Sequence, residues 1–230
     1  DRGGLGAGTT LVLKNGSESQ VVTSNGVVSF ATKVDFGSSY NLTVDAQPEG
    51  QTCLVINGSA NLATDADITN VSVLCSANPY SLGGTVSGLV SGTTLVLNNG
   101  LYTQSITANG SFTFTDQVTF QSAYAVTVGT QPTGQTCVVT SGGTGTMPSS
   151  NVTSVVVTCT PNPYSISGSL PAGANIVASG SSVSNAITVN AGNYIMDAKY
   201  GDVVTLSATK TGESCTVAGS PVTVTDNMTA

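Results

Sequence analysis

The sequence repeats itself at a fixed spacing, and this repeat limits the folds that the chain can adopt. The interval from Cys53 to Cys137 equals the interval from Cys75 to Cys159. The same offset relates further positions without a gap, namely Tyr40 to Tyr124, Phe30 to Phe114, Gly26 to Gly110 and Leu11 to Leu95. Such self-similarity predicts one small structural unit for each copy.

The chain contains a third, more divergent copy. Asn162-Pro163-Tyr164 follows Asn78-Pro79-Tyr80 at the same offset. By contrast, Thr211-Gly212-Glu213-Ser214-Cys215 follows Thr133-Gly134-Gln135-Thr136-Cys137 at a shorter one, so the third copy has lost residues in between. We therefore predict three small domains in the 230-residue chain: repeat 1 (1–77), repeat 2 (78–161) and repeat 3 (162–230).

Apolar residues alternate with polar ones between turn residues, which predicts β-strands throughout. In repeat 2 the expected strands are 80–88, 93–99, 102–108, 111–115, 122–130, 135–140 and 151–159. Asn99-Gly100 and Asn109-Gly110 supply the residues that tight hairpin turns require. No stretch of the chain combines helical spacing with helix-forming residues. About seven short strands per copy is typical of an immunoglobulin-like sandwich, so we expect an all-β chain of three tandem immunoglobulin-like domains.

The two outer repeats are shorter than repeat 2. Asp1 aligns with Thr85, so repeat 1 lacks the counterpart of 76–84, most of a first strand. Asn227 aligns with Asn151, so repeat 3 lacks the counterpart of 154–159, most of a last strand, and Cys215 lacks a partner. Either the 230 residues are a window of a longer array, or neighbouring molecules complete each other. In the second case the alternating segment Pro221-Val222-Thr223-Val224-Thr225 is the candidate donor strand for repeat 1 of the next subunit.

The cysteine spacing indicates disulfides rather than a metal site. The two complete pairs, 53 with 75 and 137 with 159, have the same wide separation, and the chain contains no histidine to complete a zinc site. We expect Cys53 to pair with Cys75 and Cys137 with Cys159, while free thiols packed as small apolar groups are the alternative. A disulfide closing a loop of this length stabilises a domain by roughly 3 kcal/mol in the chain-entropy model. Disulfides would imply an oxidising compartment, outside the cytosol.

The charge pattern argues against several kinds of partner. The chain has 5 Lys and Arg and 12 Asp and Glu, for a net charge of −7. Nucleic acids and anionic membranes attract clustered basic residues, so neither is an expected partner. No apolar run approaches the roughly 20 residues of a membrane-spanning helix.

The sequence contains no recognisable catalytic or cofactor site. Without histidine a Ser-His arrangement is excluded, and Asp116 is the one carboxylate of repeat 2. Asp65-Ala66-Asp67 could ligate calcium, but it lacks further oxygen ligands and has no counterpart in the other repeats, which favours a solvated loop. Seven Asn-x-Ser/Thr sequons are compatible with glycosylation, although a chain rich in Asn, Ser and Thr forms sequons by chance; they begin at Asn15, Asn41, Asn57, Asn70, Asn109, Asn151 and Asn227.

Several segments together resemble a known kind of repeat. They are Asn-Pro-Tyr-Ser-Leu-Gly-Gly-Thr-Val-Ser-Gly-Leu at 78–89, Ala-Asn-Gly-Ser-Phe-Thr-Phe at 108–114 and Tyr-Ala-Val-Thr-Val-Gly-Thr-Gln-Pro-Thr-Gly-Gln-Thr-Cys at 124–137. These resemble the tandem immunoglobulin-like repeats of bacterial secreted and surface lipoproteins. The resemblance implies export, one disulfide per repeat and service as a stalk, adhesive surface or spacer. Repeat 3 departs from the pattern because it lacks the Phe-x-Phe strand and one cysteine.

Two classes of function remain. The first is a non-enzymatic extracellular structural protein, a rod-like surface or filament-forming subunit. Its expected partner is a second copy of itself or neighbouring repeats of the same chain. The short junctions Ser76-Ala77-Asn78-Pro79 and Thr160-Pro161-Asn162-Pro163 favour it, because proline restricts bending. The second is an adhesin or accessory binding module of a secreted or surface-anchored bacterial protein. The end loops lack clustered aromatic or charged anchors, which makes the structural class the better hypothesis.

Overall fold

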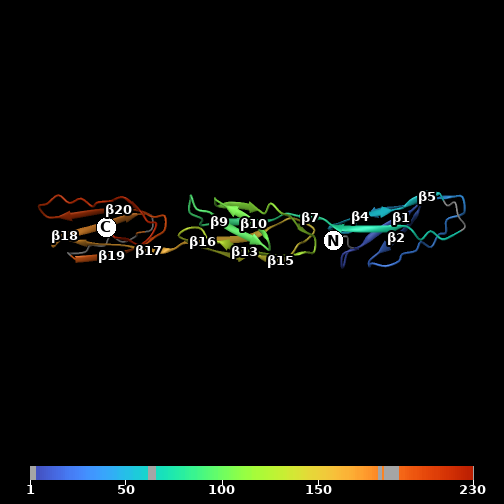
Figure 1. Ribbon diagram of the computed structural model, residues 1–230, viewed down its shortest axis with the longest axis horizontal. Helices are drawn as coiled ribbons and strands as arrows, with labels where there is room; N and C mark the ends of the chain where they lie inside the picture. Colours follow the sequence, from blue (N-terminus) through green and yellow to red (C-terminus); the bar gives the residue numbers. More distant parts are fainter. Residues whose placement is uncertain (1–3, 62–65, 181–182, 184–191, 230) are drawn as a thin grey trace. The chain divides into compact units, whose positions relative to one another are not determined.

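The computed structural model describes residues 4–61, 66–180, 183 and 192–229, and this part of the chain is entirely β-strands, turns and extended segments (Figure 1). Among these residues none forms a helix that could cross a membrane. Contacts within the chain divide it into two compact units. The first comprises Asp1–Gly83, Thr113–Ala125 and Thr144–Thr153, and the second comprises Gly84–Phe112, Val126–Gly143 and Ser154–Ala230. Because the described residues form only strands, turns and extended segments, the all-β prediction is confirmed.

Repeat 1 forms two sheets from the residues that the structure describes. A four-stranded sheet has the order β2-β1-β3-β5, and a two-stranded sheet pairs β4 with β6. Leu11 and Leu13 alternate with less buried residues on β1, which is the pattern that packs one face of a sheet against a core. The strands are β1 (Leu11–Asn15), β2 (Glu18–Val22), β3 (Ser39–Ala46), β4 (Gln51–Ile56), β5 (Ser59–Asn61) and β6 (Ser72–Ala77).

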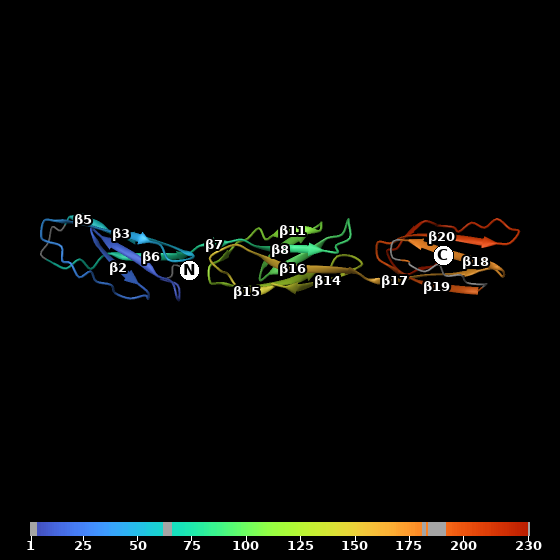
Figure 2. The same ribbon diagram turned by 180° about the vertical axis from the view of Figure 1, so that it is seen from behind.

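Repeat 2 reproduces this arrangement and adds to it. One sheet has the order β10-β9-β13-β15, and a second has the order β11-β8-β16-β14, whose labels lie together in Figure 2. A third, two-stranded sheet pairs β12 with β7. The strands are β7 (Pro79–Tyr80), β8 (Leu82–Ser87), β9 (Leu95–Asn99), β10 (Tyr102–Ile106), β11 (Gly110–Thr113), β12 (Val118–Thr119), β13 (Ala123–Thr130), β14 (Gln135–Ser141), β15 (Thr144–Thr146) and β16 (Val152–Pro161).

The described residues of repeat 3 form two three-stranded sheets, with the orders β19-β17-β22 and β18-β20-β21. Its core is formed around Ile166, Ile176, Met196 and Val204, each of which is at most 1% exposed. The strands are β17 (Pro163–Leu170), β18 (Ala174–Gly180), β19 (Gly192–Lys199), β20 (Val203–Lys210), β21 (Val222–Thr223) and β22 (Met228–Thr229).

The strands of repeat 2 differ from the expected ones in three places. The single strand expected at 80–88 is divided at Ser81, whose N–H donates to the Asn151 side chain at 2.9 Å. The short strands β12 and β15 were not predicted, because two or three residues are too few to show an alternating pattern and β15 contains a glycine. The remaining expected strands lie where the alternation placed them, within a few residues.

The second sheet is more complete in repeat 2 than in repeat 1. In repeat 2, β16 lies between β8 and β14, whereas its counterpart β6 pairs with β4 alone among the described residues. Val155 and Val157 of β16 are fully buried, but their counterparts Val71 and Val73 are only half-buried. Repeat 1 thus has a shallower core in the part of the chain that the structure describes.

Candidate functional site: the junctions between repeats

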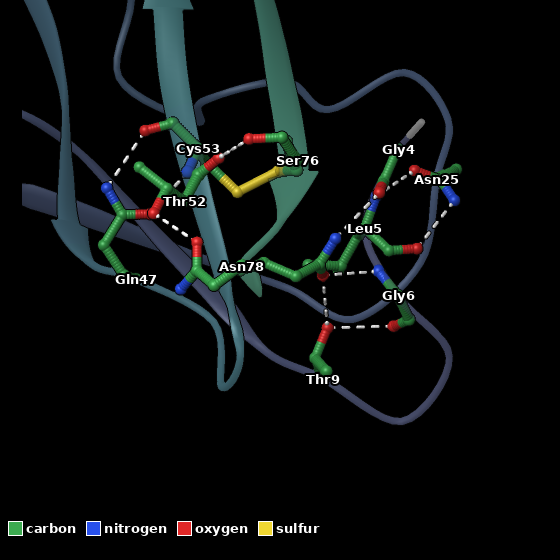
Figure 3. The surroundings of a disulfide bond; sticks show 12 residues. Gly4, Leu5, Gly6, Thr9, Asn25, Gln47, Thr52, Cys53, Ser76 and Asn78 are labelled. Carbon is green, nitrogen blue, oxygen red and sulfur yellow. Dashed lines mark hydrogen bonds between the residues drawn. A yellow bond between two sulfur atoms is a disulfide. The ribbon is translucent and has the colours of Figure 1, made fainter. Parts of the chain in front are cut away.

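The motif Gly-Gln-Thr-Cys stands at the start of β4 and of β14, and each of its residues has a separate structural task. Figure 3 shows the surroundings of the first of these motifs, with Thr52 and Cys53 labelled. Cys53 forms a disulfide with Cys75 across the β4–β6 pair, with a Cα–Cα distance of 3.9 Å. Cys137 and Cys159 form the same cross-strand disulfide between β14 and β16. Two disulfides in one chain suggest an oxidising compartment.

The glutamine of the motif in repeat 1, Gln51, binds the segment that precedes β1. The Gln51 side chain is buried, and its Oε1 accepts from Gly6 N at 2.6 Å and from Thr9 Oγ1 at 3.2 Å. Its Nε2 donates to Gly4 O at 3.2 Å. Because the side chain pairs both its donor and its acceptor, burying it carries little penalty and fixes the path of the backbone around it.

Repeat 2 contains the same arrangement at the equivalent positions. Gln135 Oε1 accepts from Val90 N at 2.8 Å and from Thr93 Oγ1 at 3.2 Å. Gln135 Nε2 donates to Gly88 O at 2.7 Å. The repetition of this buried contact at equivalent atoms shows that the glutamine is part of the architecture of the repeat.

A second glutamine supports the disulfide from outside the motif. Gln47 Nε2 donates to Cys53 O at 3.0 Å, and its Oε1 accepts from Cys53 N at 2.7 Å. Gln131 makes the same two hydrogen bonds to the backbone of Cys137, at 2.9 and 2.7 Å. The strand edge beside each disulfide is therefore capped by an amide side chain, so its backbone groups are satisfied.

The asparagine of the linker connects repeat 1 to repeat 2. Asn78 N donates to Gly50 O at 2.9 Å, and Asn78 O accepts from Phe120 N at 2.9 Å. The third residue of the motif completes the contact, because Thr52 Oγ1 donates to Asn78 Oδ1 at 2.7 Å. These groups all lie within the first compact unit. Asn78 thus binds both a turn of repeat 1 and a loop of repeat 2.

The linker between repeat 2 and repeat 3 is bound in the same way, within the second compact unit. Asn162 N donates to Gly134 O at 2.8 Å, and Asn162 O accepts from Tyr200 N at 3.1 Å. Thr136 Oγ1 donates to Asn162 Oδ1 at 2.9 Å. The two junctions of the chain therefore share one set of contacts.

The glycine of the motif receives an aromatic ring from the following repeat. Gly50 has a φ of 65°, and a Cβ added there would lie 2.4 Å from Phe120 Cγ. Gly134 has a φ of 68°, and a Cβ would lie 1.9 Å from Tyr200 Cδ2. Glycine is required for two reasons at both positions, since the backbone is left-handed and the ring occupies the place of a side chain.

The residue after each aromatic ring also contacts the preceding repeat. Gln121 Nε2 donates to Ala7 O at 2.8 Å. At the second junction a Cβ on Gly201 would lie 3.1 Å from Val90 Cγ1. The Ser149 hydroxyl donates to the Glu49 carboxylate at the first junction. Each junction thus combines a hydrogen-bonded linker, an aromatic ring packed on a glycine and a further contact between the two repeats.

The structure places the remaining predicted residues as follows. Cys215 is half-buried and forms no disulfide with any described residue. The segment Pro221–Thr225 lies in its own repeat, where Val222 and Thr223 pair with β20 and Val224 is fully buried. Asp65 lies outside the described residues, and no group of three or more His, Cys, Asp or Glu elsewhere in the described chain could hold a metal ion.

Several sequon asparagines make hydrogen bonds within the fold. Asn109 Nδ2 donates to Leu89 O, and its Oδ1 accepts from Leu89 N, both at 2.7 Å. The backbone N–H groups of Ser81 and Ser165 donate to Asn151 and Asn227. The donor and the acceptor of the Asn109 side chain are both paired with the Leu89 backbone, so structural pairing explains that asparagine without modification.

Sequence reasoning found the cysteines but missed the junction residues beside them. The Gly-Gln-Thr-Cys motif occurs in both repeat 1 and repeat 2, but the pattern assigned no role to its glycine. Phe36 and Phe120, which stand at the offset of the repeat, were a further available signal. The atoms that meet across a junction can be identified only from the folded structure, because the two partners of a contact are up to 114 residues apart in the sequence.

The fold and the junctions define an all-β, disulfide-bonded protein of tandem repeats. No protein-family model matches the chain, and no curated protein matches it. Among solved structures, the Bacillus anthracis TIE protein is similar to this chain with a TM-score of 0.49 and 12% identity. The similar region covers 96% of this chain and 46% of that protein, so this chain spans about half of its length.

Proposed function

We propose that the chain is a non-enzymatic extracellular structural protein. It consists of three tandem immunoglobulin-like β-sandwich domains and serves as a rod-like surface subunit or filament-forming subunit. One observation carries the proposal: two successive junctions use the same linker, turn and aromatic contacts at equivalent positions. A repeated junction of this kind restrains each repeat against the next, which a load-bearing array requires.

The composition of the linkers supports the same function. In both linkers the bound asparagine is followed by proline, which restricts the backbone and limits bending. A flexible tether between independent binding modules would need none of these contacts. The two disulfides suit an exported protein, and the sequence has no histidine for acid-base chemistry.

The partner in this proposal is a second copy of the chain. Donation of the strand Pro221–Thr225 to another molecule is one route of assembly. It would require β21 to leave β20 and would expose Val224, at a cost of about 2 kcal/mol for that side chain alone. Removal of residues 220–230 tests this route, because assembly through the tail would then be lost while repeat 2 stays folded.

Electron microscopy of the purified chain over a range of concentrations tests the proposed function. Extended particles that associate end to end as the concentration rises are the expected result. Compact particles of single-chain mass at all concentrations would contradict it. The tail deletion examined on the same grids separates strand donation from other routes of assembly.

An adhesin or accessory binding module is the second candidate, and one surface favours it. Leu101 is 97% exposed and Tyr102 is 51% exposed, next to each other at the turn between β9 and β10. Exposed aromatic and aliphatic anchors are common at the centre of binding surfaces. Loss of cell or matrix binding in a double variant, Leu101→Ala with Tyr102→Ala, would favour this function; unchanged binding would exclude that surface.

A further inference from the structure

The kind of turn that receives an aromatic ring at the junctions occurs three times among the described residues. In each turn the N–H of the fourth residue donates to the carbonyl of the first: Gln51 to Pro48, Gln135 to Pro132 and Glu213 to Lys210, at 3.2 to 3.3 Å. The third residue is a glycine with a positive φ each time, of 65°, 68° and 79°. Repeat 3 therefore carries the same receiving turn, Lys210–Glu213.

The loop that supplies the ring also occurs three times. Its first carbonyl accepts from the N–H three residues later, in Asp35–Ser38, Thr119–Ser122 and Lys199–Asp202, at 3.0 to 3.1 Å. The second residue is aromatic, namely Phe36, Phe120 or Tyr200. The third has a positive φ, of 82°, 62° and 85°. Each repeat therefore has both halves of a junction.

In the part of the chain that the structure describes, two of the receiving turns hold an aromatic ring from the next repeat. Among these residues the third receiving turn holds no ring, and the ring of the third aromatic loop packs on no receiving turn. Phe120 and Tyr200 are half-buried against Gly50 and Gly134. Phe36 is 71% exposed. A Cβ on Gly212 would meet no other described atom within 4 Å. The exposed ring is in repeat 1, and the uncovered turn is in repeat 3.

We propose that Phe36 of one molecule packs on the Lys210–Glu213 turn of a second copy of this chain. This rests on the proposed function of a self-associating structural subunit and names the contact through which it associates. The internal junctions provide the geometry, with the ring over the glycine of the turn. The two surfaces are different from each other, and such a heterologous contact permits continued growth.

The contact between molecules is expected to be weaker than the internal junctions. Within the chain the covalent linker holds the two surfaces at an effective concentration on the order of millimolar, and the linker asparagine adds its hydrogen bonds. Two separate molecules have neither advantage. Association through Phe36 is therefore expected at high protein concentration, or where anchoring to a surface concentrates the chain.

Sedimentation velocity of the full chain and of Phe36→Ala tests the contact. Phe36 is exposed, so the variant is expected to fold normally. Its self-association constant should fall by roughly tenfold or more, as for the loss of a central aromatic anchor. Val27→Ala is the matched control, since Val27 is 99% exposed in the same repeat and should have no effect.

Disulfide trapping identifies the partner surface. In a Cys215→Ser background, a Phe36→Cys chain mixed with a Thr211→Cys chain should form a disulfide-linked heterodimer under mild oxidation. A Val27→Cys chain mixed with the same partner should cross-link far less. Equal cross-linking from both positions would overturn the assignment of the surface.

The outcomes separate this proposal from the proposed function. If the wild-type chain associates and Phe36→Ala associates equally well, the Phe36 contact is wrong and the structural function stands. If the wild-type chain stays monomeric at millimolar concentration, both self-association and the Phe36 contact are wrong. Loss of association in Phe36→Ala with selective cross-linking supports both.

Discussion

Replacing Gly134 with alanine should loosen repeat 3 from repeat 2, and Gly212→Ala is its matched control. Both glycines occupy the third position of the same turn, with φ values of 68° and 79°. The left-handed backbone alone costs alanine about 1–2 kcal/mol at either position. At Gly134 the new Cβ also displaces the half-buried Tyr200 ring, which adds about 1 kcal/mol of lost burial.

Native-state hydrogen exchange reports this effect at the junction itself. Tyr200 N donates to Asn162 O at 3.1 Å, so its amide is protected while the junction is closed. Gly134→Ala should reduce this protection by roughly tenfold or more, because about 1.4 kcal/mol corresponds to a factor of ten. Gly212→Ala should leave the Tyr200 amide unchanged, because nothing in the described chain packs on that glycine.

Equal protection of the Tyr200 amide in Gly134→Ala and in the wild-type protein would refute the reasoning. It would show that the ring can move aside without opening the hydrogen bond of the linker. A loss of protection in both variants would also refute it, since the effect would then come from the turn and not from the ring.

Three further predictions concern the support of single repeats. Removing the Cys137–Cys159 disulfide should lower the free energy of unfolding by about 3 kcal/mol in a guanidinium titration. Gln135→Leu should lower it by about 2 kcal/mol, because two backbone groups lose their buried partner. Hydrogen bonds from the Thr32 side chain and from the Ala31 N–H hold the pKa of Glu18 below its ordinary value of 4.5. The Glu18 contact is therefore complete above pH 4.5 and lost as the pH falls through the lowered pKa, which NMR of the Ala31 amide will follow.

The cysteine and glutamine predictions each have a control variant of the same residue type at a position without the supporting contact. Cys215→Ser should not change stability appreciably, because Cys215 forms no disulfide among the described residues. Gln117→Leu is the control for Gln135, since Gln117 is exposed. Glu18→Gln should remove the pH dependence of the Ala31 amide. A loss of stability in Cys215→Ser as large as that from opening a disulfide, or equal losses in the two glutamine variants, would contradict these assignments.

Much of the fold could be predicted because the pattern that encodes it is local. Alternation in segments such as Leu95-Val96-Leu97 identifies a strand and its buried face, and both leucines are fully buried in the structure. Glycine after asparagine at 99–100 predicted a turn, and Gly100 has a φ of 60°. Short strands such as β12 could not be predicted, because two residues show no alternation. Residues 118–119 form a strand because they pair with β7, which is distant in the sequence.

The junctions could be predicted only in part, because their contacts join distant residues. The spacing of the cysteines was informative, since a disulfide needs two members of one residue type. The aromatic rings leave a weaker signal, because Phe36 and Phe120 stand at the repeat offset but the second junction has a tyrosine, Tyr200, in place of phenylalanine. The donor-strand hypothesis followed from the alternating valines of 221–225, but the same alternation suits the place that Val224 takes in the core of repeat 3.

Backbone ¹⁵N relaxation of the full chain tests most directly the claim that the junctions restrain neighbouring repeats. If they do, residues of repeat 2 and repeat 3 will report the same overall rotational diffusion in the wild-type protein. Gly134→Ala should then give repeat 3 a shorter correlation time than repeat 2. Independent tumbling of the repeats in the wild-type protein would contradict the claim and would favour a chain of flexibly linked binding modules.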